Sequence, residues 1–167
     1  EARAATTALR EGNKPAYLRL GRAGERQIHD DAPDFEIGRA SPVLDGNDCT
    51  VIATGAILAV AADAAALLRK QGILVRLISM HTLSPLDVGA IRRAADTAMV
   101  VTIEEHGPGG LSSSVAEALV GQQVTFVPIY VTGGPITVAG TQSSLRARCG
   151  LTAENLASKI QGGLERG

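Results

Sequence analysis

The chain lacks several features that mark whole classes of protein. It has no tryptophan, and aromatic residues make up 2% of its 167 residues, so it offers no platform on which nucleic-acid bases could stack. Its 16 basic and 17 acidic residues leave a formal net charge of -1, without the broad positive field that nucleic-acid or anionic-membrane binding needs. The composition therefore indicates an ordinary globular protein with neither kind of partner.

Long apolar runs and paired cysteines are missing as well. The longest apolar run, residues 57–68, is interrupted by Asp63 and is far shorter than the roughly 20 residues of a membrane-spanning helix. Cys49 and Cys149 stand far apart, which excludes a disulfide framework and a paired-cysteine metal knuckle and fits a reducing compartment. The chain begins at Glu1 without a signal-peptide pattern, so we expect a cytoplasmic protein and a piece of a longer chain.

From Asp48 onward, short β-branched runs alternate with helical stretches rich in alanine and leucine. This alternation is typical of repeated β-α-β units, and the near-continuous hydrophobicity of the runs predicts strands buried on both faces of a parallel sheet. Right-handed crossovers would place helices on both faces. The fold class is therefore α/β, with a doubly wound, mostly parallel sheet. The strands predicted within it are residues 49–53, 73–79, 98–103 and 124–130.

The predicted helices are marked by their ends. A helix over residues 57–71 is closed by Gly72, a residue suited to a C-terminal cap. Ser84 is the predicted N-cap of the next helix, with Pro85 at its first position and Asp87 three residues after the cap. Thr152 is the predicted N-cap of the last helix. This last helix covers residues 153–164, and one further helix is predicted over residues 111–120.

The first part of the chain does not follow this rhythm. Residues 2–10 are typical of the end of a helix, and residues 15–20 predict a strand that has no sheet of its own. Residues 22–33 are charged and irregular and predict an exposed linker. We therefore expect a domain boundary near residue 34.

The richest cluster of polar side chains follows the strand 98–103. Glu104, Glu105 and His106 precede a glycine-rich turn and a helix, and ligands of open α/β sheets collect at such carboxyl ends of strands. The dinucleotide fingerprint fails because Ser112 occupies its third glycine position, and the nucleophile elbow fails because Ser114 replaces its final glycine. A nucleotide cofactor and a hydrolase are therefore not expected here.

The other candidate functional residues can each be explained by a purely structural role. Consecutive strand residues point to opposite faces, so Glu104, Glu105 and His106 alone do not predict a metal site. His106 could border an active site because it follows a strand. His29 and His81 have no ligand-like neighbours in sequence, so the favoured interpretation for them is a polar loop or a satisfied histidine.

Arg22 stands between Gly21 and Ala23, directly after the strand predicted over residues 15–20. A guanidinium presented there can bind a phosphate or carboxylate through two hydrogen bonds. The alternative is a solvated linker arginine, as expected for Arg26, and the residues alone favour that alternative.

The chain resembles the C-terminal end of the transketolase family, and bacterial split transketolases in particular. The segments that carry this resemblance occur in the family's order and spacing over essentially all of the chain. They are residues 15–22, 35–38, 51–55, 80–87, 104–106 with 109–111, and 150–152.

The resemblance implies three parts. Residues 1–22 would be the tail of a pyrimidine-binding domain, residues 23–34 a linker, and residues 35–167 the transketolase C-terminal domain, with a sheet of about five strands. The family transfers a two-carbon ketol unit between ketose and aldose phosphates with thiamine diphosphate and Mg²⁺, in the pentose phosphate class of reactions. Both cofactors would bind outside this segment, which would hold no catalytic residue and be inactive alone. Its expected partners are the N-terminal portion or subunit and, for the complete unit, a second copy in a homodimer.

One residue role and one departure follow from the resemblance. Arg22 matches the family's arginine that contacts the substrate phosphate. Residues 133–140 replace a family segment that carries a charged pair and an aromatic residue, so substrate choice could differ. Deoxyxylulose-phosphate synthase and the β subunit of a 2-oxo acid dehydrogenase remain alternatives, as does a non-catalytic regulatory or assembly module.

Overall fold

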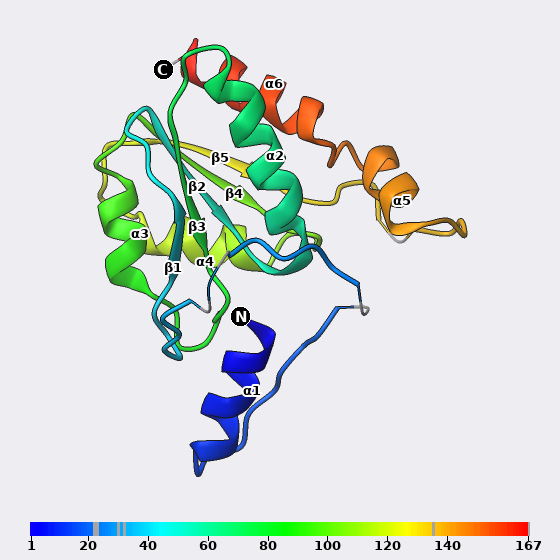
Figure 1. Ribbon diagram of the computed structural model, residues 1–167. Coiled ribbons are helices and arrows are strands. Elements are labelled where there is room, and N and C mark those ends of the chain that lie inside the picture. The colour runs from blue at the N-terminus through cyan, green and yellow to red at the C-terminus, as the bar shows by residue number, and fades with distance from the viewer. Residues whose placement is uncertain (22–23, 30, 32, 135, 167) are drawn as a thin grey trace.

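The computed structural model describes residues 1–21, 24–29, 31, 33–134 and 136–166, and its described strands form one sheet (Figure 1). The order across the sheet is β1-β3-β2-β4-β5. The prediction of a doubly wound α/β fold with a mostly parallel sheet is confirmed. The strands are β1 (Ser41–Leu44), β2 (Cys49–Ala53), β3 (Val75–Ser79), β4 (Met99–Ile103) and β5 (Thr125–Ile129).

Four of the strands run parallel, and one edge strand runs the other way. Val51 at the centre of β2 lies opposite Leu77 of β3 and Val101 of β4, and every residue of β2 and β4 is buried. This burial on both faces explains why their sequences are continuously apolar. This edge strand, β1, was not predicted from the sequence, and it pairs antiparallel with β3.

Two helical layers cover the sheet. The helices α2 (Leu58–Arg69) and α6 (Ala153–Leu164) pack on one face, and α3 (Val88–Ala94) and α4 (Leu111–Ala118) pack on the other (Figure 1). A short 3-10 turn, Gly55–Ile57, leads into α2. The two layers enclose two apolar clusters, one centred on Val51, Leu68 and Leu156 and the other on Ile52, Ile91 and Leu111.

Helix ends confirm two of the predicted caps and correct one. Gly72 adopts a φ of 83° after α2, and the Thr152 hydroxyl accepts a hydrogen bond from Asn155 N at the start of α6. The prediction of Ser84 as an N-cap is wrong. Asp87 caps α3 instead, because its carboxylate accepts hydrogen bonds from Ala90 N at 2.8 Å and Ala40 N at 2.9 Å.

Among the described residues before residue 35, the chain forms a helix but no strand. Helix α1 (Ala2–Glu11) matches the predicted helix and buries none of its residues. The predicted strand over residues 15–20 is wrong for this structure, because no neighbouring strand pairs with it there, and Tyr17 is 88% exposed. Within the described residues, no helix has the length and apolar character needed to cross a membrane.

Candidate functional site

The carboxyl ends of β2 and β4 meet where the sheet reverses its strand order. From β2 the chain continues to β3 on one side, whereas β4 lies on the other side of β2, which is the position where open α/β sheets bind ligands. Thr54 N after β2 donates to Ile103 O at 3.4 Å, and Glu104 N donates to Ile129 O at 3.1 Å. The sequence Glu104-Glu105-His106 therefore begins at this edge, as predicted.

Glu104 is used to cap a helix. Its side chain is buried, and its carboxylate accepts hydrogen bonds of 2.8 Å from both Leu111 N and Ser112 N at the start of α4. A β-carbon at Gly110 would clash with this carboxylate, so a larger residue there would push Glu104 away from the helix end. Because a carboxylate already occupies the free N–H groups of α4, that helix end does not offer an anion site to a diphosphate.

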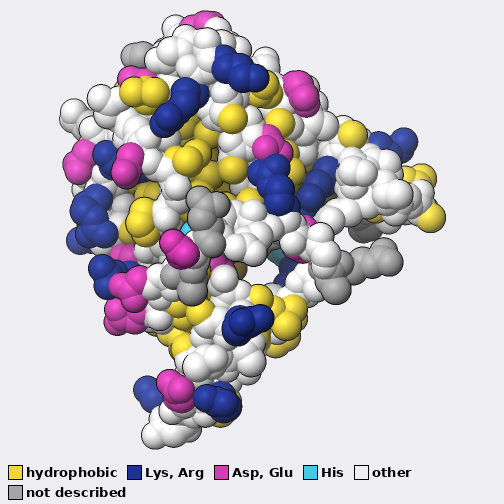
Figure 2. All heavy atoms as spheres, viewed as in Figure 1, with side chains coloured by type: hydrophobic (Ala, Val, Ile, Leu, Met, Phe, Trp, Pro, Cys, Tyr) yellow, Lys and Arg dark blue, Asp and Glu magenta, His cyan; other side chains and the backbone are white. Residues whose placement is uncertain are grey.

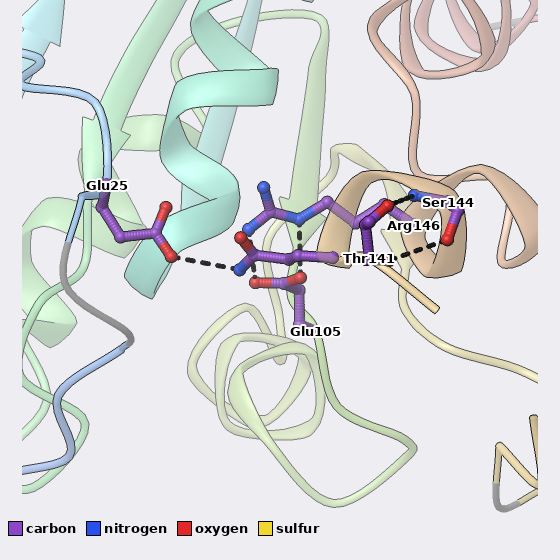
Figure 3. Close-up of polar contacts among 6 residues, drawn as sticks. Glu25, Glu105, Thr141, Ser144 and Arg146 are labelled. Carbon is purple, nitrogen blue, oxygen red and sulfur yellow. Dashed lines mark hydrogen bonds and ion pairs between the residues drawn. The ribbon is translucent and has the colours of Figure 1, made fainter. Parts of the chain in front are cut away.

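Glu105 points the other way and pairs with Arg146, a residue that was not predicted to belong to the site. Arg146 Nε donates to Glu105 Oε1 at 2.7 Å, and Arg146 Nη2 donates to Glu105 Oε2 at 2.9 Å (Figure 3). Donation of these hydrogen bonds to the Glu105 carboxylate raises the pKa of Arg146. The pair joins the end of β4 to α5 (Gln142–Arg148), a helix that was also not predicted.

Two further contacts fix the start of α5. The Thr141 hydroxyl accepts a hydrogen bond from Ser144 N at 3.2 Å, which caps the helix. Gln142 Nε2 donates to Glu25 Oε1 at 3.1 Å, so α5 also contacts the segment that precedes the sheet (Figure 3). The polar cluster drawn in Figure 3 thus brings together three parts of the chain that are distant in sequence.

His106 lies beside an open cavity at the same edge. Its Nδ1 lies 2.9 Å from Gly107 O, and its carbonyl oxygen accepts a hydrogen bond from Val131 N at 3.0 Å. A cavity of about 460 Å³ lies next to this turn, and backbone and neutral side chains line it. Its lining residues are Gly107, Pro108, Tyr130, Val131, Thr132, Gly133 and Gly134.

Arg22 lies outside the described residues, and its predicted role stays a prediction. Residues 24–27 are exposed, as predicted for a linker, and one of them makes specific contacts with the sheet domain. Arg26 Nη1 donates to both carboxylate oxygens of Asp63 in α2, at 2.8 and 3.0 Å, and Nη2 donates to Ala59 O at 2.8 Å. Arg26 is half-exposed, as expected for a solvated linker arginine, and it also binds α2, which the sequence did not predict. The signal available in the sequence was Asp63, the single charge within the apolar run of α2.

The remaining two histidines have structural contacts. His29 Nε2 lies 2.9 Å from Glu1 Oε1. His81 stacks on Phe35 with ring centroids 4.2 Å apart, and its Nδ1 lies 2.9 Å from the Thr82 hydroxyl. Burial lowers the pKa of His81 below its usual value.

The cysteines and the potential metal ligands form no reactive centre in the described part of the chain. Cys49 is fully buried in β2, and burial raises the pKa of its thiol to about 11, which disfavours the reactive thiolate. Cys149 is half-buried and free. No group of three or more His, Cys, Asp or Glu side chains among the described residues could hold a metal ion. Figure 2 shows basic and acidic side chains interspersed over the visible face.

Comparisons with known proteins agree with this architecture. The family described as "Transketolase, C-terminal domain" matches residues 38–156. One of the subunits of the apulose-4-phosphate transketolase of Phocaeicola vulgatus is 37% identical over 148 residues, which cover 86% of this chain and 46% of that protein. The SqwH subunit of the 6-deoxy-6-sulfo-D-fructose transketolase of Clostridium sp. strain MSTE9 is 35% identical over 158 residues, which cover 92% of this chain and 48% of that protein.

A solved structure shares the whole arrangement of elements. It is described as a split gene transketolase in an inactive β4 tetramer, and it superimposes with a TM-score of 0.86 at 35% identity, covering 98% of this chain and 53% of that one. Several 1-deoxy-D-xylulose-5-phosphate synthases also match. The chain spans about half the length of the split transketolase subunits that it matches. The sheet, its two helical layers and these matches show that the chain belongs to the transketolase family and contains that family's C-terminal domain.

Proposed function

We propose that this chain is the C-terminal part of the second subunit of a two-subunit transketolase, the subunit that completes the enzyme. The observation that carries the proposal is that relatives similar to most of this chain are themselves single subunits of transketolases. The family match over residues 38–156 agrees with it. The reaction is the transfer of a two-carbon ketol unit from a ketose to an aldose, each carrying a terminal anionic group. One relative's name contains a phosphate and the other's a sulfonate, and an arginine can bind both groups through two hydrogen bonds.

The polar side chains at the switch point support a structural role for this domain. Glu104 is engaged with the α4 N-terminus, and Glu105 with Arg146. Thiamine diphosphate and a divalent metal do not fit the described residues, because the carboxylates at this edge already have partners and no metal-ligand group forms. When bound by the rest of the enzyme, thiamine diphosphate supplies the carbanion chemistry, and no reaction step is assigned to this chain's own residues.

Arg22 is the one residue to which we assign substrate contact. It would bind the terminal phosphate of the sugar, and the family resemblance supports this role. His106 remains a candidate for the border of the active site, because it lies at the carboxyl end of β4. The partners of the chain are then the N-terminal portion or subunit, a second copy of the complete unit in a homodimer, and anionic sugars in the cytoplasm. The domain limits 1–22, 23–34 and 35–167 belong to the same proposal.

The test is reconstitution. This chain, within its complete subunit, is combined with the thiamine-binding partner and assayed with a panel of donors and acceptors. We expect thiamine-dependent ketol transfer from the assembly and none from this chain alone. The matching 1-deoxy-D-xylulose-5-phosphate synthases favour one second candidate, for which pyruvate would be the effective donor. Turnover of branched 2-oxo acids would indicate a dehydrogenase β subunit, and an assembly without turnover would indicate a regulatory module.

A further inference from the structure

Three buried polar atoms at one end of the β1–β3 pair have no hydrogen-bond partner among the described residues. They are Ser41 Oγ, Ser79 Oγ and His81 Nε2. Ser41 is 2% exposed and Ser79 is fully buried, so bulk solvent does not satisfy their hydroxyl groups. The described part of the chain contains one other such atom, Thr102 Oγ1 in β4. Three of these four atoms therefore belong to one place in the fold.

Strand pairing brings the three atoms close together. Ser41 of β1 lies directly opposite Ser79 of β3 in the antiparallel ladder (Figure 1), and the β-carbons of such residues are about 4.5–5.5 Å apart. The parallel ladder with β2 continues past the end of β3, because Met80 N donates to Ala53 O at 2.8 Å. His81 follows Ser79 by two positions, so its side chain points to the same side of the strand.

The protein's own groups near these atoms are engaged elsewhere or are out of reach. The two serine hydroxyls face each other across the ladder without a hydrogen bond between them. His81 Nδ1 lies 2.9 Å from the Thr82 hydroxyl. The Arg39 backbone lies beside the His81 ring, but it makes no hydrogen bond with Nε2.

The chemistry of the three atoms indicates what would satisfy them. A hydroxyl can donate and accept a hydrogen bond, and a neutral imidazole nitrogen does one or the other. None of the three groups is a carboxylate or a guanidinium, so the place does not select an ion. A small neutral molecule that both donates and accepts fits all three atoms. Water is such a molecule, and buried water in proteins typically makes about three hydrogen bonds to polar groups that have no other partner.

We propose that Ser41, Ser79 and His81 form a binding site for one internal water molecule. The water bridges Ser41 Oγ, Ser79 Oγ and His81 Nε2, and it thereby ties the edge strand β1 to β3. Strand β1 has four residues, so a bridge at its first residue adds to a short ladder. The inference is independent of the proposed function, because it involves no substrate, cofactor or partner subunit.

The first measurement locates the water directly. In a high-resolution crystal structure of the complete subunit, we expect an ordered water at hydrogen-bond distance, about 2.7–3.2 Å, from both serine Oγ atoms and from His81 Nε2. In Ser79→Ala, this water should be lost or displaced. A site without water overturns the proposal, as do serine hydroxyls bonded to backbone carbonyls or a direct bond from His81 Nε2 to the Arg39 carbonyl.

The second measurement uses the direction of a change in local stability. Deleting a hydroxyl that is bonded to a bound water is destabilising, whereas deleting a buried hydroxyl without any partner is neutral or stabilising. Hydrogen exchange in the complete subunit reports the opening equilibrium of the β3 amides. Ser79→Ala should raise the opening constant by about fivefold.

Thr102→Val is the matched control, because it deletes the unpartnered hydroxyl that lies outside this site while keeping the shape of the side chain. It should leave the opening constant of the sheet unchanged or lower it. An opening constant in Ser79→Ala that is unchanged or lowered overturns the proposal.

A double variant tests whether the two serines share one partner. With a shared water, the fold-change in Ser41→Ala combined with Ser79→Ala should be smaller than the product of the two single fold-changes. This is because the second hydroxyl loses its partner once the water is released. Effects that multiply would show separate partners and contradict the site. If a variant does not fold, the presence or absence of the water in the unmodified subunit still decides.

Discussion

Arg146 and Glu105 are 41 positions apart in sequence, and they form a two-bond ion pair with distances of 2.7 and 2.9 Å. The Arg146 side chain is only 13% exposed. The pair attaches α5, a helix that buries none of its own residues, to the carboxyl end of β4. An ion pair thus attaches α5 to the sheet, whereas the other helices of this domain pack against the sheet through apolar faces.

This arrangement predicts that Arg146→Ala loosens α5. Glu105 would lose both of its hydrogen bonds in a half-buried place, so we expect the free energy of unfolding to fall by about 1–2 kcal/mol. Urea denaturation measures this change. Arg148→Ala, at an exposed position of the same helix, should cost less than about 0.5 kcal/mol. Equal losses in the two variants would contradict the account.

A second prediction concerns the cap of α4. Glu104→Ala would leave Leu111 N and Ser112 N without their acceptor in a buried place, which should cost about 1–3 kcal/mol. Glu104→Gln keeps one acceptor oxygen and should cost less. Thermal unfolding compares both with Glu117→Gln at an exposed position of α4. If Glu117→Gln lowered stability as much as Glu104→Ala is expected to, or if Glu104→Ala did not lower it, the capping role of Glu104 would be refuted.

The lowered pKa of His81 predicts a particular dependence on pH. The folded chain binds a proton at His81 less readily than the unfolded chain does, because burial disfavours the charged ring. The contribution of His81 to the free energy of unfolding is therefore fully present above the unfolded pKa of about 6.5. It decreases as the pH falls below that value. Between pH 7 and pH 5, His81→Gln should lose less free energy of unfolding than the unmodified chain. A parallel decline in both chains would contradict this role, whatever their absolute stabilities.

Cysteine reactivity gives a fourth prediction. The Cys49 thiol is buried and has a pKa of about 11, so iodoacetamide at pH 8 should leave it unmodified in the folded protein. The half-buried Cys149 should react first, and both should react in urea. Mass spectrometry of the alkylated peptides distinguishes the two sites. Rapid modification of Cys49 in the native protein would show that β2 opens.

Those parts of the fold that have strong local patterns could be predicted from the sequence. The limits of β2 and α6 match the structure at both ends, because buried parallel strands are continuously apolar and Thr152 marks a helix start by its own chemistry. The limits of β1 could not be found in the same way. It has four residues, includes Pro42, and depends on antiparallel pairing with β3.

The candidate site was less predictable because its contacts are distant in sequence. The position of Glu104 and Glu105 at a strand end could be predicted, but their partners could not. Helix α5 buries no side chain and so has no apolar pattern. The Arg26 contact needs the chain to fold back over 37 positions to Asp63. The lone charge in the apolar run of α2 was the one local hint of that contact.

The measurement that most directly tests the central claim is a titration of activity. A fixed amount of the thiamine-binding partner is mixed with increasing amounts of the complete subunit that contains this chain, and ketol transfer to a phosphorylated aldose is followed with and without thiamine diphosphate. The account predicts a cofactor-dependent rate that rises and saturates at equal amounts of the two components. A rate that the partner reaches alone, or no transfer at any ratio despite formation of the complex, would contradict it.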